Sequence, residues 1–472
     1  MNIYKNKYIK YKNKYLELKK GGTLDSENDL LKNYYIISSH NTYLESNQLI
    51  GTTNIFCYLN FIKKYGGGCV EFDIIKIMKK DGNEDVIISH KNTLSESIYL
   101  REILSGIYTI LNDTKINKYG PVILSFDNKS INKYCEHQII WKLLKEILKE
   151  YLYTNYEEEN LTISNVKNKV LIKWKQSTKI CNCDCNCAKN CKDKCITESK
   201  KKCIDTNLFK INENIEIESK QIESKKIESK ERWTHLNQFN TESHTPPEYN
   251  LTDYNKLSKN SKNIISKYIK LTKTKFIRVY PHGKNVLSGN YDFYKNLILG
   301  IQLIALNIQK QDIQTMTQME FFRNGCLRKK PECLIEDNNI DNNIDNIITK
   351  ILTKEDYTLI FDNDLKYIKI YVYDSQNYLE LKNNKIKISI LKNFKQIYIK
   401  CIYNNNKYKG SITLNENINY LYKIDKYSIN NCNWFSDKNL KDKIQLRCEL
   451  NENEKIFKCN IKHITDDTIS QH

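Results

Sequence analysis

The sequence has no apolar stretch long enough to cross a membrane. The longest candidate, residues 297–308, is interrupted by Gln302 and Asn307 and is shorter than the ~20 residues of a spanning helix. The first residues also lack the apolar core of a secretory signal peptide. These absences predict a soluble cytoplasmic protein, in which the 16 Cys are mostly reduced thiols rather than disulfides.

Acidic residues are outnumbered by basic ones, with 56 Asp and Glu against 75 Lys and Arg and a formal net charge of +19. A balance this basic favours anionic partners, such as nucleic acid, an anionic membrane or phosphorylated small molecules. The charge alone does not choose among these partners.

The first 29 residues form a basic segment with a helical pattern. Tyr4, Tyr8, Tyr11, Tyr15 and Leu18 recur at spacings of four and three, which places them on one face of a helix surrounded by lysines. The helix is expected to pack on the main domain or to pair with another helix; a membrane-surface helix is the alternative. The segment is similar to N-terminal segments common in proteins of large DNA viruses.

Short apolar runs alternate with helical patterns through much of the chain, which at 472 residues has room for two or three domains. Such alternation is typical of a parallel sheet or an α/β barrel. The expected strands are 34–39, 69–75, 85–89, 121–126 and 169–174, then 249–251, 275–280 and 302–307, with helices including 98–111, 139–151 and 258–271. Eight strands predict a distorted (β/α)8 barrel whose halves are residues 30–178 and 248–335.

Residues 179–247 differ from both halves and are interpreted as a linker. They hold seven Cys between Cys181 and Cys203, followed by three near-repeats of Ile-Glu-Ser-Lys from residue 217 to 230. Low-complexity polar sequence does not fill a core. The Cys-x-Cys spacing differs from the Cys-x-x-Cys pairs of structural zinc sites, so binding of soft metals and sensing of oxidation are alternatives to a plain linker.

Beyond the second half the pattern becomes β-rich. Short runs recur at 357–361, 367–372, 386–391, 396–403, 444–448 and 455–461. Regularly spaced short strands predict a smaller all-β sandwich over residues 350–472.

Polar side chains gather at the carboxyl ends of the expected barrel strands, which is where barrel enzymes place their active sites. Asn41, Glu71, Asp73 and Asp127 bring four oxygen-bearing side chains from three strands. Because strand side chains alternate, Glu71 and Asp73 point to the same face. Hard oxygen ligands of this kind suit Ca²⁺.

Two histidines, His40 and His90, follow the first and third expected strands and are suited to moving protons near neutral pH. They complete a candidate site for acid–base chemistry beside a cation.

The remaining candidates are cationic or aromatic. Lys173, Lys175 and Arg278 form a pocket suited to phosphates, and Tyr280 offers a flat face to a sugar-like ring. Each of these residues alone is more often structural, so the interpretation depends on their joint placement at successive strand ends.

Short motifs in a fixed order resemble the X and Y regions of eukaryotic phosphoinositide-specific phospholipases C. For the X region they are residues 37–44 (ISSHNTYL), 68–73 (GCVEFD), 90–94 (HKNTL), 121–128 (PVILSFDN) and 171–175 (LIKWK). For the Y region they are residues 276–281 (FIRVYP), 288–291 (SGNY) and 302–307 (QLIALN).

The resemblance implies roles for the same residues. His40 and His90 would be catalytic, Glu71 the general base for the inositol 2-hydroxyl, Asn41, Glu71, Asp73 and Asp127 the Ca²⁺ ligands, and Lys173, Lys175, Arg278 and Tyr280 the headgroup site. One position departs from the family, since Asp127 stands where Glu is usual and its carboxylate is one methylene shorter. The β-rich domain would be the family's C2-like domain.

The implied activity is calcium-dependent cleavage of phosphatidylinositol 4,5-bisphosphate into diacylglycerol and inositol phosphate, in phosphoinositide signalling and lipid degradation. The protein would be a monomer, peripheral at the inner membrane surface, with no nucleic-acid partner. A catalytically weak phosphoinositide-binding scaffold, a glycerophosphodiester phosphodiesterase and a nucleic-acid-binding protein are the alternatives. Only about 30 residues precede the barrel, too few for a pleckstrin-homology domain or an EF-hand pair.

Overall fold

The computed structural model describes residues 28–45, 52–89, 97–116, 120–128, 134–154, 161–175, 242–249, 254–281, 289–335, 340–361, 364–373, 378–381, 383–414, 416, 419–424, 443–451 and 454–462. The N-terminal segment, His90 and the Cys cluster therefore lie outside the described residues. No helix within these ranges is both long and apolar enough to cross a bilayer.

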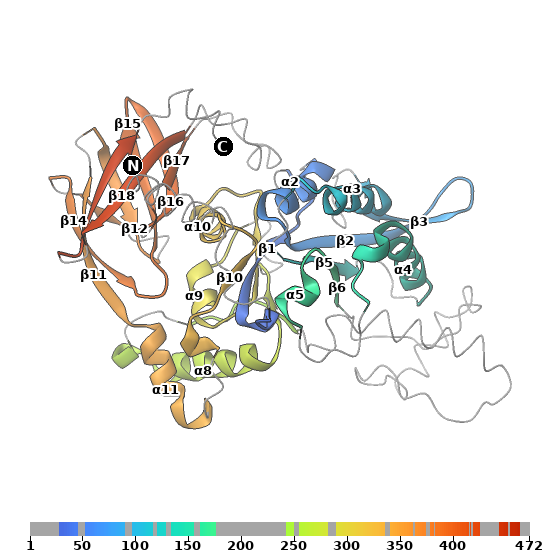
Figure 1. Cartoon of the computed structure of the whole chain (residues 1–472), viewed down its shortest axis with the longest axis horizontal. Coiled ribbons are helices and arrows are strands. Elements are labelled where there is room, and N and C mark those ends of the chain that lie inside the picture. The colour runs from blue at the N-terminus through green and yellow to red at the C-terminus, as the bar shows by residue number, and fades with distance from the viewer. Residues whose placement is uncertain are drawn as a thin grey trace, which may run out of the picture.

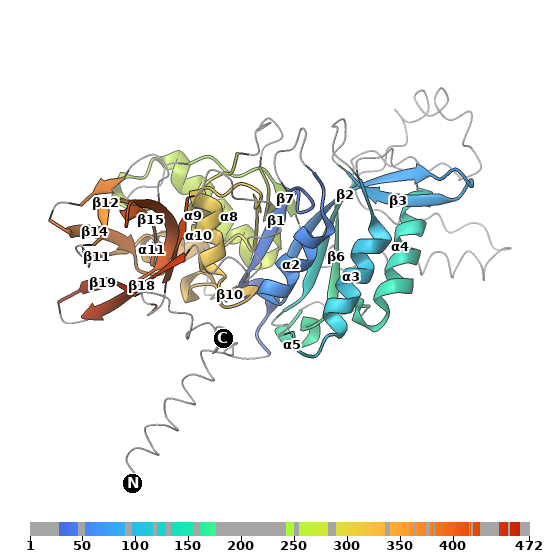
Figure 2. The ribbon, with the colours of Figure 1, turned by 90° about the horizontal axis from the view of Figure 1, so that it is seen from above.

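The larger domain is built on a curved, mostly parallel sheet (Figures 1 and 2). Its parallel strands lie in the order β6-β5-β2-β1-β9-β8-β7. Their bounds are β1 Tyr34–His40, β2 Gly68–Met78, β5 Val122–Asn128, β6 Val170–Lys175, β7 Glu242–His244, β8 Ile277–Val279 and β9 Leu303–Asn307. The described residues show no pairing between β6, which ends just before the proposed linker, and β7, which comes next in the described chain. The predicted split barrel is confirmed.

Two details of the strand prediction are wrong. The expected third strand is β3 (Glu84–Ile88), which runs antiparallel to β2 and pairs with β4 (Ile98–Tyr99), so it extends a hairpin rather than continuing the barrel. Tyr249, the first residue of the strand expected at 249–251, is not in a strand, and residues 250–251 lie outside the described ranges. The strand that pairs with β8 is β7, which lies inside the segment assigned to the linker. A further strand, β10 (Leu327–Lys329), is antiparallel to β1.

Helices cover the outside of the sheet, and Figure 2 shows α2, α3 and α4 side by side along the first half. The α-helices are α2 Ile55–Tyr65, α3 Leu100–Asn112, α4 Tyr134–Leu148, α5 Ile163–Val166, α8 Lys259–Thr274, α9 Phe293–Ile298, α10 Ile313–Phe321 and α11 Ile340–Ile351. The 3-10 turns are η1 Leu31–Asn33, η2 Lys149–Tyr151, η3 Tyr254–Lys256 and η4 Glu332–Leu334. The expected helices at 98–111, 139–151 and 258–271 are confirmed as α3, α4 with η2, and α8.

Helix α3 shows why these segments form. Leu100, Ile103, Leu104, Ile107 and Leu111 recur at spacings of three and four, so they form one apolar stripe. All five are buried in the barrel's hydrophobic core. Burying that stripe against the sheet, rather than helix propensity, supplies most of the helix's stability.

The smaller domain is a nine-stranded sheet in the order β13-β12-β15-β16-β17-β18-β19-β11-β14. Its strands are β11 Lys354–Phe361, β12 Lys366–Tyr371, β13 Leu379–Glu380, β14 Lys385–Leu391, β15 Gln396–Tyr403, β16 Asn406–Thr413, β17 Asn419–Lys423, β18 Lys443–Asn451 and β19 Ile456–Lys462. Ile370 and Ile390, from near opposite ends of this order, share one core, so the sheet folds over itself as a sandwich. This agrees with the predicted C2-like domain.

Helix α10 of the barrel packs against β15 and β16 of the smaller domain (Figure 1). Glu320, largely buried in this contact, accepts hydrogen bonds from Thr413 Oγ1 at 3.0 Å and Arg323 Nη1 at 3.1 Å. Arg323 also pairs with Glu416 at 2.8 Å. Burial raises the pKa of Glu320 to about 7, despite the opposing charge of Arg323.

Replacing Glu320 by Gln is expected to raise the melting temperature most at pH 8. A carboxyl with a raised folded-state pKa binds its proton more tightly when folded, so its contribution to stability is lost as pH rises through that pKa. Gln keeps the acceptor without the buried charge. Thermal unfolding from pH 5 to pH 8 should show the gain shrinking toward acid; a gain that is constant with pH would contradict this assignment.

Candidate active site

Strand β1 delivers the first site residues. The strand ends at His40, and Asn41 then adopts a left-handed conformation with φ of 47°, which Asn tolerates better than most residues. This turn aims the buried Asn41 N–H at Glu71 Oε2, 2.9 Å away. The backbone therefore ties the end of β1 to the carboxylate of β2.

Three carboxylates converge above β2 and β5. Asp73 and Asp127 are register partners on these parallel strands, and Glu71 lies two residues before Asp73 on the same face. Ligand oxygens of Glu71, Asp73 and Asp127 lie within 4.8 Å of one another. Glu71 and Asp73 are buried. The shorter Asp127 thus still reaches the cluster.

The donor set fits a hard cation such as Ca²⁺. Carboxylate oxygens at this mutual distance repel one another unless a cation or protons compensate them. Asn41 Nδ2 is buried and has no hydrogen-bond partner in the described part of the chain, and Oδ1 has only a long contact, 3.4 Å, with the Tyr43 hydroxyl. Tyr43 also donates to Asp73 at 2.8 Å, which fixes that carboxylate.

His40 is held by two neighbours. Its Nδ1 lies 2.8 Å from Asn307 Oδ1 at the end of β9, and its Nε2 lies 3.5 Å from Glu71 Oε2. Gln309 Nε2 donates to the same Asn307 oxygen at 3.2 Å. Since that oxygen only accepts, Nδ1 carries a proton and Nε2 faces the carboxylate cluster.

Arg278 forms a buried ion pair inside the barrel. Its Nη2 lies 3.2 Å from Glu71 Oε1, and both side chains are almost fully buried. Burial opposes the charge of Arg278, but the Glu71 carboxylate and other neighbours outweigh it and raise the pKa of Arg278. Its Nε has no hydrogen-bond partner among the described residues. Arg278 therefore pairs with the Glu71 carboxylate and keeps a donor for a ligand.

Lys173 adds a second buried cation. It lies on β6 beside Ser125, which is itself beside Glu71 on β2. Burial, followed by the charge of Arg278, lowers the pKa of Lys173 to about 7. Two cations buried near each other form a pocket that an anion would stabilise.

Tyr280 packs beside both His40 and Arg278. Its ring is parallel to that of His40, with centroids 6.4 Å apart, and the Arg278 guanidinium lies 5.7 Å from its centroid. The ring is half-buried, so one part of it faces the site and another faces solvent.

The structure brings together all but two of the predicted site residues. His90 lies outside the described residues, and Lys175 belongs to β6 but its side chain is not described. Two residues of the site were missed, Asn307 and Tyr43. Asn307 ends a strand as a polar residue, the same signal that identified His40, and Tyr43 belongs to the motif that contains His40 and Asn41.

Large apolar side chains are exposed around the same end of the barrel. Phe56 lies in the first turn of α2, the helix that follows β1, Met78 ends β2, and Tyr99 ends β4, directly before α3. Their exposed fractions are 57%, 63% and 38%. Exposed apolar groups clustered at one end are typical of a surface that meets a partner or a membrane.

Comparison with known protein families gives two matches. Residues 28–176 match the family described as "Phosphatidylinositol-specific phospholipase C, X domain", and residues 225–332 match its "Y domain". The two matches together span more than half of the chain.

Individual relatives either match a smaller part of this chain or match it at lower sequence identity. A 1-phosphatidylinositol 4,5-bisphosphate phosphodiesterase gamma of Caenorhabditis elegans is 34% identical over 31% of this chain and 11% of its own length. Human "Inactive phospholipase C-like protein 2" is 26% identical over 62% of this chain and 26% of its own. The crystal structure of L. pealei PLC21 superposes with a TM-score of 0.53 at 18% identity, over 94% of this chain and 57% of its own. The chain is thus well short of the relatives' full length.

Proposed function

Because the chain carries the X and Y domains of phosphatidylinositol-specific phospholipase C, we propose that it cleaves phosphoinositides at the bond between diacylglycerol and phosphate. The observation that supports this most is the joint arrangement of His40, the three carboxylates and the buried Arg278 at the carboxyl ends of the barrel strands. The proposed substrate is phosphatidylinositol 4,5-bisphosphate and the products are diacylglycerol and inositol phosphate.

The residues divide the chemistry between them. Glu71, which pairs with Arg278, is placed to take the proton of the inositol 2-hydroxyl as that oxygen attacks phosphorus. His40 Nε2 faces the same region and can stabilise the negative charge that develops on the phosphoryl oxygens. His90, by family resemblance, would return a proton to the departing diacylglycerol oxygen. Hydrolysis of the cyclic phosphodiester would then complete the reaction.

Asn41, Glu71, Asp73 and Asp127 are proposed to hold Ca²⁺ through their side-chain oxygens. When bound, the ion would lower the pKa of the attacking hydroxyl and offset phosphate charge. The protein fixes the positions of the ligand side chains by two hydrogen bonds, from the Tyr43 hydroxyl to Asp73 and from the Asn41 backbone N–H to Glu71.

Lys173, Lys175 and Arg278 are proposed to hold the ring phosphates, with Tyr280 packed on the inositol ring. The buried Lys173 and the open Nε of Arg278 support this pocket. An unphosphorylated ring would bring no anion to the buried Lys173 or to the Nε of Arg278, so a phosphorylated headgroup should bind better than unphosphorylated phosphatidylinositol.

The surroundings of the site suggest where the protein works. The exposed Phe56, Met78 and Tyr99 near the site support peripheral binding at the inner surface of an anionic membrane by a cytoplasmic monomer. The proposed division of the chain is a basic segment at 1–29, barrel halves at 30–178 and 248–335, a Cys-rich linker at 179–247 and a C2-like domain at 350–472. The position of β7 extends the second half to at least residue 242.

The second candidate function is a phosphoinositide-binding scaffold without turnover, because the matched relatives include human and mouse proteins named inactive phospholipase C-like protein 2. A scaffold would need the cationic pocket alone. This chain also has His40 and a cluster of three carboxylates from Glu71, Asp73 and Asp127. A module that only binds phosphoinositides does not require these groups. Catalysis is therefore the better proposal.

Product analysis separates these two functions. The full chain would be incubated with Ca²⁺ and mixed micelles of phosphatidylinositol 4,5-bisphosphate, and the water-soluble products followed by ³¹P NMR. Cleavage through the 2-hydroxyl predicts inositol 1,4,5-trisphosphate together with its 1,2-cyclic form. Binding of the micelles with no soluble phosphate product would favour the scaffold, and release of phosphatidic acid would contradict the proposed bond.

A further inference from the structure

Asn290 belongs to the motif at residues 288–291 (SGNY), which has no part in the proposed chemistry. Its side chain is half-buried at the carboxyl end of β9. The side-chain Oδ1 accepts the backbone N–H of Asn307 at 2.7 Å, and Nδ2 donates to the Asn307 carbonyl at 3.2 Å. The amide of Asn290 therefore pairs with both backbone groups of Asn307, as a residue of a neighbouring strand would.

Asn307 is the residue that orients His40. The two are register partners on the parallel strands β9 and β1, and Asn307 Oδ1 lies 2.8 Å from His40 Nδ1. Asn307 is fully buried, so the position of its backbone decides where this oxygen lies. A shift of the Asn307 backbone therefore moves the acceptor that holds the His40 ring.

Asp312 fixes the orientation of the Asn290 amide. Its Oδ2 accepts from Asn290 Nδ2 at 3.1 Å, and its Oδ1 accepts from the backbone N–H and the hydroxyl of Thr315 at 3.0 and 3.1 Å. The Thr315 hydroxyl in turn accepts from Asn290 Nδ2 at 2.9 Å. Burial raises the pKa of Asp312, and the hydrogen bonds from Thr315 and Asn290 oppose that shift. With acceptors on one side and the Asn307 N–H on the other, the amide of Asn290 fits in one orientation only.

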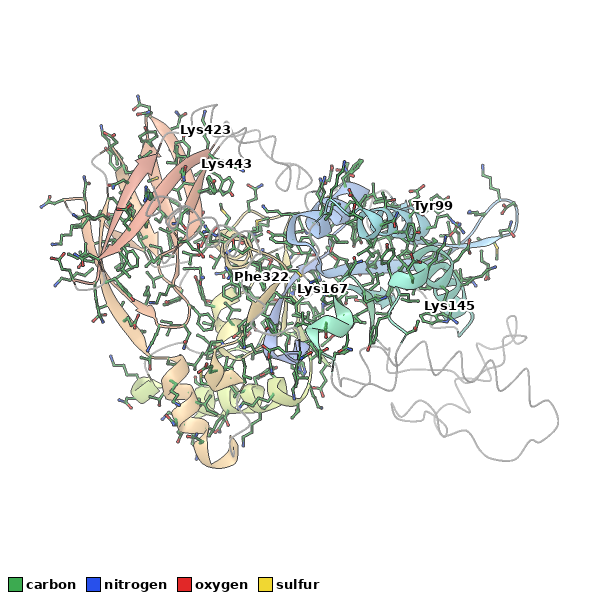
Figure 3. All side chains as sticks on the ribbon, in the orientation of Figure 1. Tyr99, Lys145, Lys167, Phe322, Lys423 and Lys443 are labelled. Atoms are coloured by element: carbon green, nitrogen blue, oxygen red, sulfur yellow. The ribbon has the colours of Figure 1, made fainter. Side chains whose placement is uncertain are left out.

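Helix α10 fixes Asp312 relative to the strands that carry His40 and Asn307. Asp312 is the N-cap of the helix. Further along the helix, Gln318 Nε2 donates to backbone carbonyls of both β1 and β9, at 3.1 and 2.6 Å. Directly after the helix, Phe322, which Figure 3 labels, is buried in the barrel core. The Asp312 carboxylate is therefore a fixed point beside the active-site end of these strands.

The loop between β9 and α10 is also held by the C-terminal domain. Lys409 Nζ on β16 donates to the carbonyl of Gln311, the residue before Asp312, at 2.9 Å. Within α10, Met316 packs on Tyr371 and Tyr398 of the same domain. Contacts from both domains thus keep Asp312 in place.

We propose that Asp312 is a positioning residue for His40, and that it acts through the side chain of Asn290 and the backbone of Asn307. The inference rests on the proposed function, because it assumes that His40 acts on the substrate. Placement matters at this position, since displacing a catalytic group by about 1 Å can cost on the order of 10²-fold in rate. The alternative is that Asp312 serves only as the N-cap of α10.

The first test is Asp312→Asn, because Asn caps a helix as well as Asp does but turns an amide donor toward Asn290 Nδ2. On dispersed short-chain phosphatidylinositol 4,5-bisphosphate, kcat should fall about tenfold with KM and the melting temperature nearly unchanged. The matched control is Asp292→Asn at the N-cap of α9, where Asp292 accepts the Lys295 backbone N–H at 3.0 Å. This control should keep the wild-type kcat. Equal kcat in the two variants would overturn the proposal.

Asn290→Ala removes the connection between Asp312 and Asn307 without changing the helix cap. It should lower kcat by up to about a hundredfold. Because Asp312 is proposed to act through Asn290, the double variant should be no slower than Asn290→Ala alone. Losses that multiply in the double variant would contradict this route. Wild-type kcat in Asn290→Ala would overturn the proposal even if Asp312→Asn failed to fold.

A spectroscopic readout separates this inference from the proposed function. In protein labelled with ¹⁵N-histidine at pH 8, the ring-nitrogen shifts of His40, assigned by their loss in His40→Ala, report which nitrogen carries the proton. Wild type and Asp292→Asn should show it on Nδ1, whereas Asp312→Asn should show a mixture of tautomers. If wild type releases no inositol phosphate yet this difference appears, the proposed function is wrong and the positioning role stands. An unchanged His40 spectrum in Asp312→Asn would remove that role.

Discussion

Replacing Glu71 by Gln is expected to lower kcat/KM by a factor on the order of 10³ or more. The carboxylate pairs with Arg278 at 3.2 Å, accepts the Asn41 N–H at 2.9 Å and lies 3.5 Å from His40. Gln keeps the size of the side chain but removes the charge, so it cannot act as a base and is a weaker cation ligand. Initial rates on mixed micelles over a range of Ca²⁺ concentrations would measure the loss.

The same substitution should also destabilise the fold. Removing one partner of a buried ion pair leaves the other charge uncompensated, which costs about 3–5 kcal/mol. Asp127→Asn is the matched control, because it removes a carboxylate of the same cluster from a half-buried position, whereas Glu71 is buried against Arg278. Urea unfolding should show a clear loss for the Glu71 variant and a small change for the Asp127 variant. Equal stability of the two would contradict the structural role given to the Glu71–Arg278 pair.

Replacing His40 by Ala is expected to lower kcat by about 10²–10⁴ with a smaller effect on KM. The imidazole is placed to act on charge that develops in the transition state, so its loss affects the chemical step more than substrate binding. Partial rescue of the Ala variant by added imidazole would identify the ring itself as the acting group. Wild-type activity in the Ala variant would remove His40 from the catalytic residues.

Asn307 offers a separate test of how His40 is positioned. Its oxygen lies 2.8 Å from Nδ1, and Asn290 in turn accepts the Asn307 backbone N–H at 2.7 Å. Asn307→Asp would place a carboxylate at that position and favour the imidazolium. The pH–rate profile should then move toward higher pH, a shift that a merely structural role for Asn307 would not produce.

Much of this site was predictable because parallel strands end at the same edge of a sheet. The apolar runs of β1, β2 and β5 are strong signals, and alternation along β2 places Glu71 and Asp73 on one face. The strand ends therefore identified His40, the carboxylates and Lys173 without knowledge of their distances.

Other features left no such signal. Strand β7 is Glu-Ser-His, three polar residues that sit in a sheet only because β8 pairs with them. Strand β3 has the apolar content of a barrel strand, and its antiparallel direction is set by the hairpin after β2. Likewise β16, rich in Lys and Asn at its start, resembles a polar loop until its pairing with β15 is known.

The pairing of Arg278 with Glu71 also could not be predicted from the sequence. Arg278 was assigned to phosphates and Glu71 to a cation, and the structure shows that they also neutralise each other across the barrel. Such contacts join residues more than 200 positions apart, and no local pattern encodes them.

The most direct test of the central proposal is the release of inositol phosphate from vesicles containing phosphatidylinositol 4,5-bisphosphate by the full chain, with Ca²⁺ and with a chelator. We predict release that requires Ca²⁺, that is lost in the His40→Ala variant and that is much slower on unphosphorylated phosphatidylinositol. Absence of release at every Ca²⁺ concentration, from a folded protein that still binds the vesicles, would contradict the assignment of this site to catalysis.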